Sequence, residues 1–181
     1  MKILAVVGSL RAGSFNRQLA SEAAKMLPQG VIMEIVDGGN LPLFNEDLEY
    51  PPPEAVTRLR EKVKSADGIW FFTPEYNHFF PGNLKNMIDW LSRPVSPTEG
   101  QVLQGKPAAI SGASPGISGT GIAQDHLRVI LSYLDMKIMN QPRLIIPNVL
   151  NQVDAGGKLV LKESLPYLQK IVNSFVSFII G

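Results

Sequence analysis

The chain has 181 residues, of which 45% are hydrophobic and 18% charged, and its formal net charge is +1. This length suits one domain with a sizeable core, residues 1–181, and the near-neutral charge gives no reason to expect a nucleic acid or an anionic membrane as partner. The absence of cysteine excludes disulfides, thiolate nucleophiles and cysteine-based metal sites.

The two histidines, His78 and His126, are far apart in the sequence, so we expect no metal site. Met1-Lys2 leads directly into an apolar stretch without the pattern of a signal peptide, and no apolar run reaches membrane-spanning length. We therefore expect a cytoplasmic protein whose partners include neither metal, nucleic acid nor membrane.

Strand and helix patterns alternate along the whole chain. Apolar runs typical of buried parallel strands occur at residues 3–7, 31–36, 68–73 and 107–111, and a fifth is expected within 137–146, interrupted near Pro142. Helical spacing of apolar residues predicts helices around residues 16–27, 53–66, 83–91, 123–134 and 161–179. Residues 41–53 are rich in proline and fit no regular element. This alternation predicts an α/β fold, an open parallel sheet with helices on both faces.

Three polar loops follow the first, third and fourth predicted strands, at residues 8–16, 74–82 and 112–121. All three are rich in glycine, serine, asparagine or proline. In an open parallel sheet the ligand binds beyond the carboxyl ends of the strands, where these loops meet. We therefore expect them to form one ligand site.

The first loop, Gly8 to Asn16, connects a strand to the start of a helix, where free amides and the macrodipole favour an anion. It is not a Walker A motif, because Ser14 and Phe15 stand where lysine and serine or threonine are required. The middle glycine of a Rossmann fingerprint is also missing. We interpret the loop as a site for one phosphate group; the alternative is an ordinary turn in which Ser14 or Asn16 caps the helix.

The second loop offers prolines, a tyrosine and a stiff turn, and the third offers glycines that allow a flat group to come close. A phosphate at one end and a planar heterocycle at the other describe a mononucleotide or a flavin. The alternative for residues 74–77 is a rigid turn in which Glu75 and Tyr76 are surface residues. A phosphatase of this architecture would need a cysteine, which the sequence lacks, and a Ser-His-Asp hydrolase would have to use one of only two histidines, His78 or His126.

Two motifs carry a family resemblance: Gly8-Ser9-Leu10-Arg11 with Ser14 and Asn16, and Pro74-Glu75-Tyr76-Asn77 followed by Pro81-Gly82, Leu84-Lys85-Asn86 and Asp89-Trp90. Together they resemble the NAD(P)H-dependent FMN reductase family, especially its chromate, quinone and azo-dye reductases. The resemblance implies a flavodoxin-like fold with a five-stranded sheet in the order 2-1-3-4-5 and tightly held FMN. It also implies NAD(P)H as co-substrate and homodimers or homotetramers in which a neighbouring subunit helps to form the flavin site.

The resemblance also implies a set of cofactor-binding residues. The FMN phosphate would be held by the first loop, through Ser9, Leu10, Arg11, Ser14, Phe15 and Asn16. The isoalloxazine edge would be lined by Pro74, Glu75, Tyr76 and Asn77, chiefly through backbone groups. The ring or the ribityl chain would be flanked by Ala113, Ser114 and Gly116. Relatives often carry serine or threonine at the position of Ala113 and Gly-Gly at that of Gly119-Thr120, so the third loop follows the family pattern least closely.

We expect FMN to carry out the chemistry and assign no catalytic side chain. The function implied is the transfer of two electrons from NAD(P)H through FMN to quinones, chromate, azo compounds or similar acceptors. One alternative is a flavodoxin-type electron carrier; such carriers are usually strongly acidic, and this chain is not. Another is a non-catalytic flavin-binding protein.

The predicted helix at 83–91 contains Met87, Ile88, Trp90 and Leu91, more apolar surface than one helix face needs. This surplus predicts that part of the helix packs against a second subunit. The alternative is that Trp90 belongs to the core of its own chain.

Overall fold

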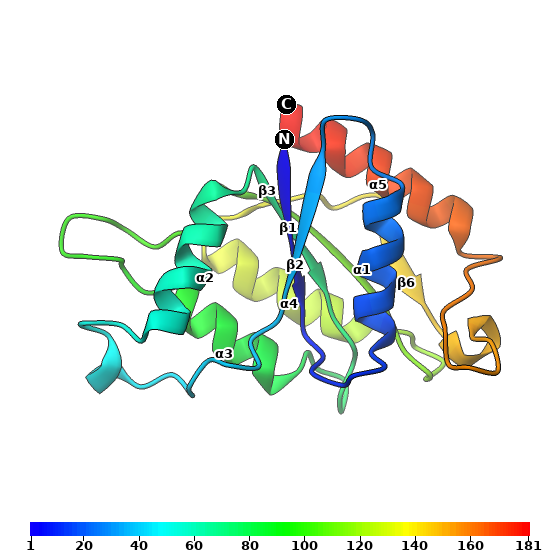
Figure 1. Ribbon diagram of the computed structural model, residues 1–181, viewed down its shortest axis with the longest axis horizontal. Coiled ribbons are helices and arrows are strands. Elements are labelled where there is room, and N and C mark those ends of the chain that lie inside the picture. Colours follow the sequence, from blue (N-terminus) through cyan, green and yellow to red (C-terminus); the bar gives the residue numbers. More distant parts are fainter.

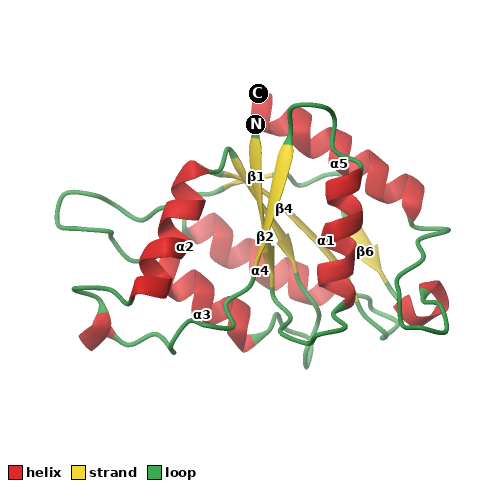
Figure 2. Cartoon of the chain, viewed as in Figure 1, coloured by secondary structure: helices red, strands yellow, loops and turns green.

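The computed structural model describes residues 1–181, and its elements alternate between strand and helix (Figures 1 and 2). The strands are β1 (Lys2–Val7), β2 (Ile32–Val36), β3 (Gly68–Phe72), β4 (Pro107–Ala113), β5 (Lys137–Ile138) and β6 (Leu144–Ile146). The helices are α1 (Phe15–Lys25), α2 (Glu54–Ser65), α3 (Gly82–Leu91), α4 (Gly121–Tyr133) and α5 (Leu165–Ile180). Two short 3₁₀ turns, η1 (Glu46–Leu48) and η2 (Val149–Gln152), complete the list.

The strands form a parallel sheet in the order β2-β1-β3-β4-β5, as the resemblance implies. The expected fifth strand is divided in two. Lys137 and Ile138 pair with the start of β4, and residues 144–146 pair with its end at residues 111–113. Pro142 lies between them, as predicted, and proline cannot donate a hydrogen bond to a strand ladder. The sheet therefore gains a sixth short strand without a change in topology.

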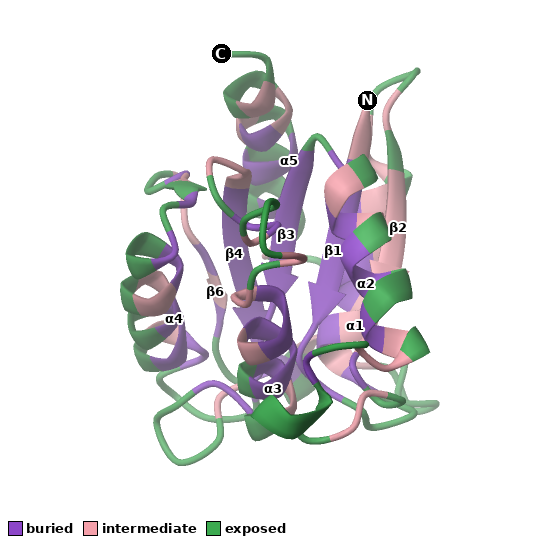
Figure 3. Ribbon diagram, turned by 90° about the vertical axis from the view of Figure 1, so that its left-hand side faces the viewer, coloured by how far each residue is buried: buried purple, intermediate pink, exposed green.

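The strand side chains alternate between two apolar clusters, one on each face of the sheet. Leu4 and Val6 belong to the cluster covered by α2, α3 and α4, whereas Ile3, Ala5 and Val7 belong to the cluster covered by α1 and α5. Figure 3 shows the central strands buried between these helices. A strand buried on both faces reads as a continuous apolar run, which is why β1 could be predicted from sequence.

The apolar residues of α3 are buried within the chain. Met87 and Trp90 are fully buried, and Ile88 and Leu91 are each 1% exposed. The prediction that these residues supply a subunit interface is therefore wrong, and the alternative, Trp90 as a core residue, is confirmed. No helix of the protein combines the length and the apolar character needed to cross a bilayer.

The irregular segment 41–53 covers α3 and accounts for its surplus apolar surface. The Asn86 side chain accepts a hydrogen bond from the Phe44 amide at 2.7 Å and donates one to the Pro42 carbonyl at 2.9 Å. Trp90 Nε1 donates to the same carbonyl at 2.9 Å, and the rings of Phe44 and Trp90 meet edge to face. One face of α3 thus fastens a loop that has almost no secondary structure of its own.

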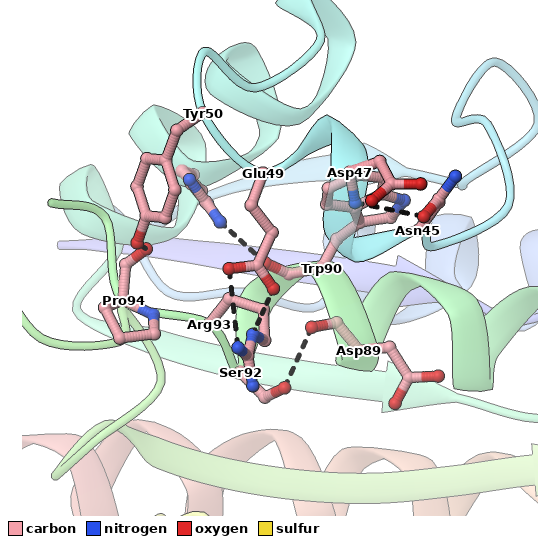
Figure 4. Close-up of polar contacts among 10 residues, drawn as sticks. Asn45, Asp47, Glu49, Tyr50, Asp89, Trp90, Ser92, Arg93 and Pro94 are labelled. Atoms are coloured by element: carbon pink, nitrogen blue, oxygen red, sulfur yellow. Dashed lines mark hydrogen bonds and ion pairs between the residues drawn. The ribbon is translucent and has the colours of Figure 1, made fainter.

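A second group of contacts holds the far end of this segment (Figure 4). Arg93 Nε donates to the buried Glu49 carboxylate at 2.5 Å, and this hydrogen bond raises the pKa of Arg93. The Tyr50 hydroxyl donates to the Pro94 carbonyl at 3.0 Å. These contacts fix the end of the segment to the residues that follow α3.

Candidate functional site

The three polar loops meet at the carboxyl ends of β1, β3 and β4 and enclose a cavity of about 370 Å³. The residues lining it are Ser9, Arg11, Ser14, Phe15, Asn16, Pro74, Glu75, Tyr76, Ala113, Ser114, Pro115 and Leu150. Of the predicted site residues, only Leu10, Asn77 and Gly116 lie outside this lining. A larger cavity, of about 640 Å³, lies beside β6 and the start of α5 and contains none of the predicted residues.

One end of the cavity is the N-terminus of α1. Ser14 is the N-cap, and its Oγ accepts a hydrogen bond from the Arg17 amide at 3.2 Å. The amides of Phe15 and Asn16 donate to no acceptor in the chain, and the first turn carries no acidic residue. Ser14 therefore has the capping role of the alternative reading, while its hydroxyl proton and the two amides remain available to an anion.

Arg11 is the cation at this end. Its guanidinium lies over the Phe15 ring, 4.6 Å from the ring centroid, and donates to the Gly13 carbonyl. Arg17, in the first turn of α1, is instead paired with Asp37, which follows β2. Ser9 is 5% exposed, and its Oγ accepts from the Arg11 amide at 3.4 Å. Arg11 is thus the only basic residue that lines the cavity.

Asn16 has a different role from its neighbours. Its side chain is buried and forms two hydrogen bonds of 2.9 Å with Ala113, donating to the carbonyl and accepting from the amide. These bonds join α1 to the end of β4. Of the Asn16 side chain, only the second hydrogen on Nδ2 remains for the predicted contact with the phosphate. A sequence gives no sign of this pairing, because the two residues are 97 positions apart.

At the opposite end, Tyr76 and Phe79 exchange backbone hydrogen bonds of 2.9 and 3.0 Å across a tight turn. Asn77 and His78 occupy the turn with φ of 51° and 59°, a left-handed pair typical of two-residue hairpins. The turn holds Asn77 at an exposed tip, outside the cavity lining. The Glu75 amide donates to no group in the chain. This amide is therefore available to a ligand.

The Glu75 side chain is only 6% exposed. Its carboxylate accepts hydrogen bonds from Ser118 Oγ at 2.9 Å and from the Ala123 amide at 3.0 Å, and His78 Nδ1 lies 3.4 Å away. Burial raises the pKa of Glu75, but the hydrogen bonds from Ala123, Ser118 and His78 together bring that pKa below its ordinary value. The reading of Glu75 as a surface residue is wrong, whereas Tyr76 is 52% exposed.

The third loop forms the remaining wall with Ala113 and Ser114, both buried. A Cβ on Gly112 would lie 2.2 Å from the Thr73 carbonyl oxygen, so only glycine permits this approach of β4 to the end of β3. Val149 donates to the Ser114 carbonyl at 3.1 Å, which brings η2 and Leu150 to the cavity. Pro115 and Leu150 were not predicted; Leu150 follows the last strand and belongs to no recognisable motif.

The sheet order and a cavity with an anion-binding end place the chain among flavodoxin-like nucleotide-binding proteins. The sequence profile described as NADPH-dependent FMN reductase matches residues 1–151. The chain belongs to this family.

Two similar proteins are reductases by name. The chain is 42% identical over 179 residues to a 2-hydroxy-1,4-benzoquinone reductase from Burkholderia sp, covering 99% of this chain and 96% of the relative. It is 44% identical over 173 residues to an NAD(P)H-dependent FMN reductase from Pseudomonas aeruginosa, covering 94% and 90% of the two chains.

Two solved structures share the fold. The flavoenzyme NAD(P)H:(acceptor) oxidoreductase FerB from Paracoccus denitrificans superposes with a TM-score of 0.87 at 33% identity, covering 98% of this chain and 96% of FerB. An FMN-dependent NADH-azoreductase from Bacillus anthracis, in complex with FMN, has a TM-score of 0.61 at 14% identity, with both chains fully covered. At that identity the likeness to the azoreductase concerns the fold alone.

Proposed function

We propose that this protein is an FMN-dependent NAD(P)H oxidoreductase that passes two electrons to quinones and similar small acceptors. The observation that carries the proposal is the cavity itself, which has free anion-binding donors at one end and closely spaced loop walls at the other. Family membership and the names of the relatives support the same function. When bound, FMN supplies the two-electron chemistry, and the protein binds and orients it.

The residues present fit the cofactor. Ser9, Arg11, Ser14 and the amides of Phe15 and Asn16 would hold the phosphate, because they are donors without an acidic neighbour at the start of a helix. Residues 74–76 and 113–115 would line the ring, with Leu150 adding an apolar contact. Burial in such a cavity excludes water from the ring. We assign no catalytic side chain.

Quinones are the acceptors that the relatives' names favour. Azo compounds and chromate are proposed as further acceptors on the family resemblance. We also propose that residues 1–181 act as a single FMN-binding domain in the cytoplasm, where NAD(P)H is available.

We propose, in addition, a homodimer or homotetramer that uses the outer face of α4. Ile122, Val129 and Tyr133 are 39%, 69% and 88% exposed. Their spacing places them on one side of the helix. These apolar side chains are exposed, with His126 between Ile122 and Val129, whereas the residues of α3 that suggested an interface are buried.

The test begins with titration of the flavin-free protein with FMN, FAD and riboflavin. We expect FMN to bind most tightly, since the other two lack a terminal phosphate in that position. Equal affinity for riboflavin would show that no phosphate is bound. Consumption of NADH or NADPH with benzoquinone as acceptor then separates a reductase from an electron carrier, which would show no turnover.

The proposed oligomer is tested separately by sedimentation. A stable monomer at micromolar concentration would contradict it.

A further inference from the structure

Glu75 connects the two loops that form the ring end of the cavity. Its own loop follows β3, and its carboxylate binds Ser118 in the loop after β4 and the amide of Ala123 in α4. Since the side chain is 6% exposed, this link lies inside the protein. Glu75 therefore joins two walls of the cavity through hydrogen bonds.

The link also supplies a cap that α4 lacks. The N-cap residue, Thr120, makes no side-chain capping bond, and the first turn of α4 contains no acidic residue. Ala123 is the third residue of the helix, the position whose amide a capping side chain usually takes. A carboxylate at a helix N-terminus is stabilised by the free amides and by the macrodipole. The anion required there comes from a loop 48 positions earlier in the chain.

A second contact docks the same loop further along α4. The Phe79 ring packs on the His126 ring with centroids 4.5 Å apart and planes at 33°. Between these two contacts, Tyr76 and the turn residues Asn77 and His78 are exposed. Loss of the Glu75 carboxylate would remove the hydrogen bonds from this loop to Ser118 and Ala123 and leave the Phe79–His126 contact in place.

We propose that Glu75 is a positioning residue: its carboxylate fixes the segment 74–76 against α4 and the loop after β4, and thereby sets the shape of the site for the flavin ring. The proposal rests on the function proposed above. It separates Glu75 from the phosphate contacts, which lie at the other end of the cavity. Loss of Glu75 should therefore alter binding of the ring and leave the preference for a phosphate unchanged.

The first test uses the flavin-free protein and hydrogen exchange at the Ala123 amide. In Glu75→Ala we expect this amide to exchange at least about tenfold faster, because a charge-assisted hydrogen bond is lost. Glu75→Gln should restore most of the protection, since its Oε1 can accept from Ala123 and its Nε2 can donate to Ser118 Oγ. The matched control is Glu54→Ala, because the Glu54 side chain is 84% exposed and lies on α2.

The second test compares flavins. In Glu75→Ala we expect the affinities for FMN and riboflavin to fall by the same factor, about tenfold, and the visible absorption band of bound FMN to shift. At saturating FMN, kcat with benzoquinone should fall by about tenfold or more, with recovery in Glu75→Gln. Ser118→Ala, which keeps the Ala123 contact, should produce a smaller change in the same direction and serves if Glu75→Ala does not fold.

Wild-type riboflavin affinity and an unshifted absorption band in Glu75→Ala would overturn the proposal, as would unchanged exchange at Ala123. A fall in FMN affinity alone would also overturn it, because that result would place Glu75 at the phosphate. If the unaltered protein binds neither flavin, the proposed function fails instead, and the exchange experiment still reports on the contact itself.

Discussion

The two ends of the cavity use their polar groups in different ways. At the α1 end, the Ser14 hydroxyl proton and the amides of Phe15 and Asn16 have no partner within the protein. At the ring end, the Glu75 carboxylate accepts hydrogen bonds from Ser118 and Ala123. Between the two ends, the side chain of Asn16 is hydrogen-bonded to the backbone of Ala113. We interpret the free donors at the start of α1 as the predicted phosphate site, and the engaged side chains as the groups that hold the walls together.

The largest effect is expected from Asn16→Ala. Removing the side chain leaves the buried amide and carbonyl of Ala113 unpaired, at about 1–3 kcal/mol each, so the free energy of unfolding should fall by about 2–6 kcal/mol. Chemical denaturation of the flavin-free protein measures this. Asn151→Ala is the control, because that exposed side chain makes no hydrogen bond. If the free energy of unfolding were unchanged and FMN binding weakened, the Asn16 side chain would be a phosphate contact and not a structural link to Ala113.

Arg11→Ala tests the phosphate end. A charge-assisted hydrogen bond contributes about 1.5–3 kcal/mol, so the Kd for FMN should rise about tenfold to a hundredfold, while riboflavin affinity barely changes. Titration with both flavins measures this, with Arg58→Ala on α2 as the control. Added salt should weaken FMN binding more in the parent than in Arg11→Ala, because a partly exposed ion pair is screened. Binding of FMN as in the parent would make Arg11 a solvated surface charge.

Ser14→Ala should have smaller effects than the two substitutions above, one on stability and one on FMN binding. Loss of the cap should lower the free energy of unfolding by about 1 kcal/mol, and loss of the hydroxyl donor should weaken FMN binding beyond that. Comparison with riboflavin separates the two, since riboflavin has no phosphate to contact the hydroxyl. Equal weakening of both flavins would mean that Ser14 is only a cap.

The smallest predicted effect is on the stability of the protein at acidic pH. The pKa of Glu75 is lowered in the folded protein, so its ionised form stabilises the fold above the unfolded pKa of about 4.3, and this contribution is lost as the pH falls through the lowered value. The difference in unfolding temperature between the parent and Glu75→Gln should therefore shrink below about pH 4.3. His78 also faces this carboxylate, so the comparison is repeated in a His78→Gln background. A difference that grows on acidification would contradict the assignment.

The fold could be predicted from sequence because the strands are buried on both faces and the helices are amphipathic. The meeting of the three loops around one cavity could be predicted because loops at one edge of a parallel sheet lie close together. The roles of Asn16 and Glu75 could not, since each depends on a backbone group far away in sequence. The α3 interface was mispredicted because the apolar count of a helix does not reveal that an irregular loop covers it.

The loop at residues 41–53, which covers α3, also bears on where the native state opens locally. Residues 41–53 have little regular structure, yet the Phe44 amide is bound to the buried Asn86 side chain at 2.7 Å. Protection from hydrogen exchange follows from such bonding and burial rather than from regular structure. The Phe44 amide should therefore exchange as slowly as the amides of α3, with loop and helix opening together as one cooperative unit. We therefore expect local opening of the native state to follow the hydrogen bonds of this loop and not its lack of regular structure.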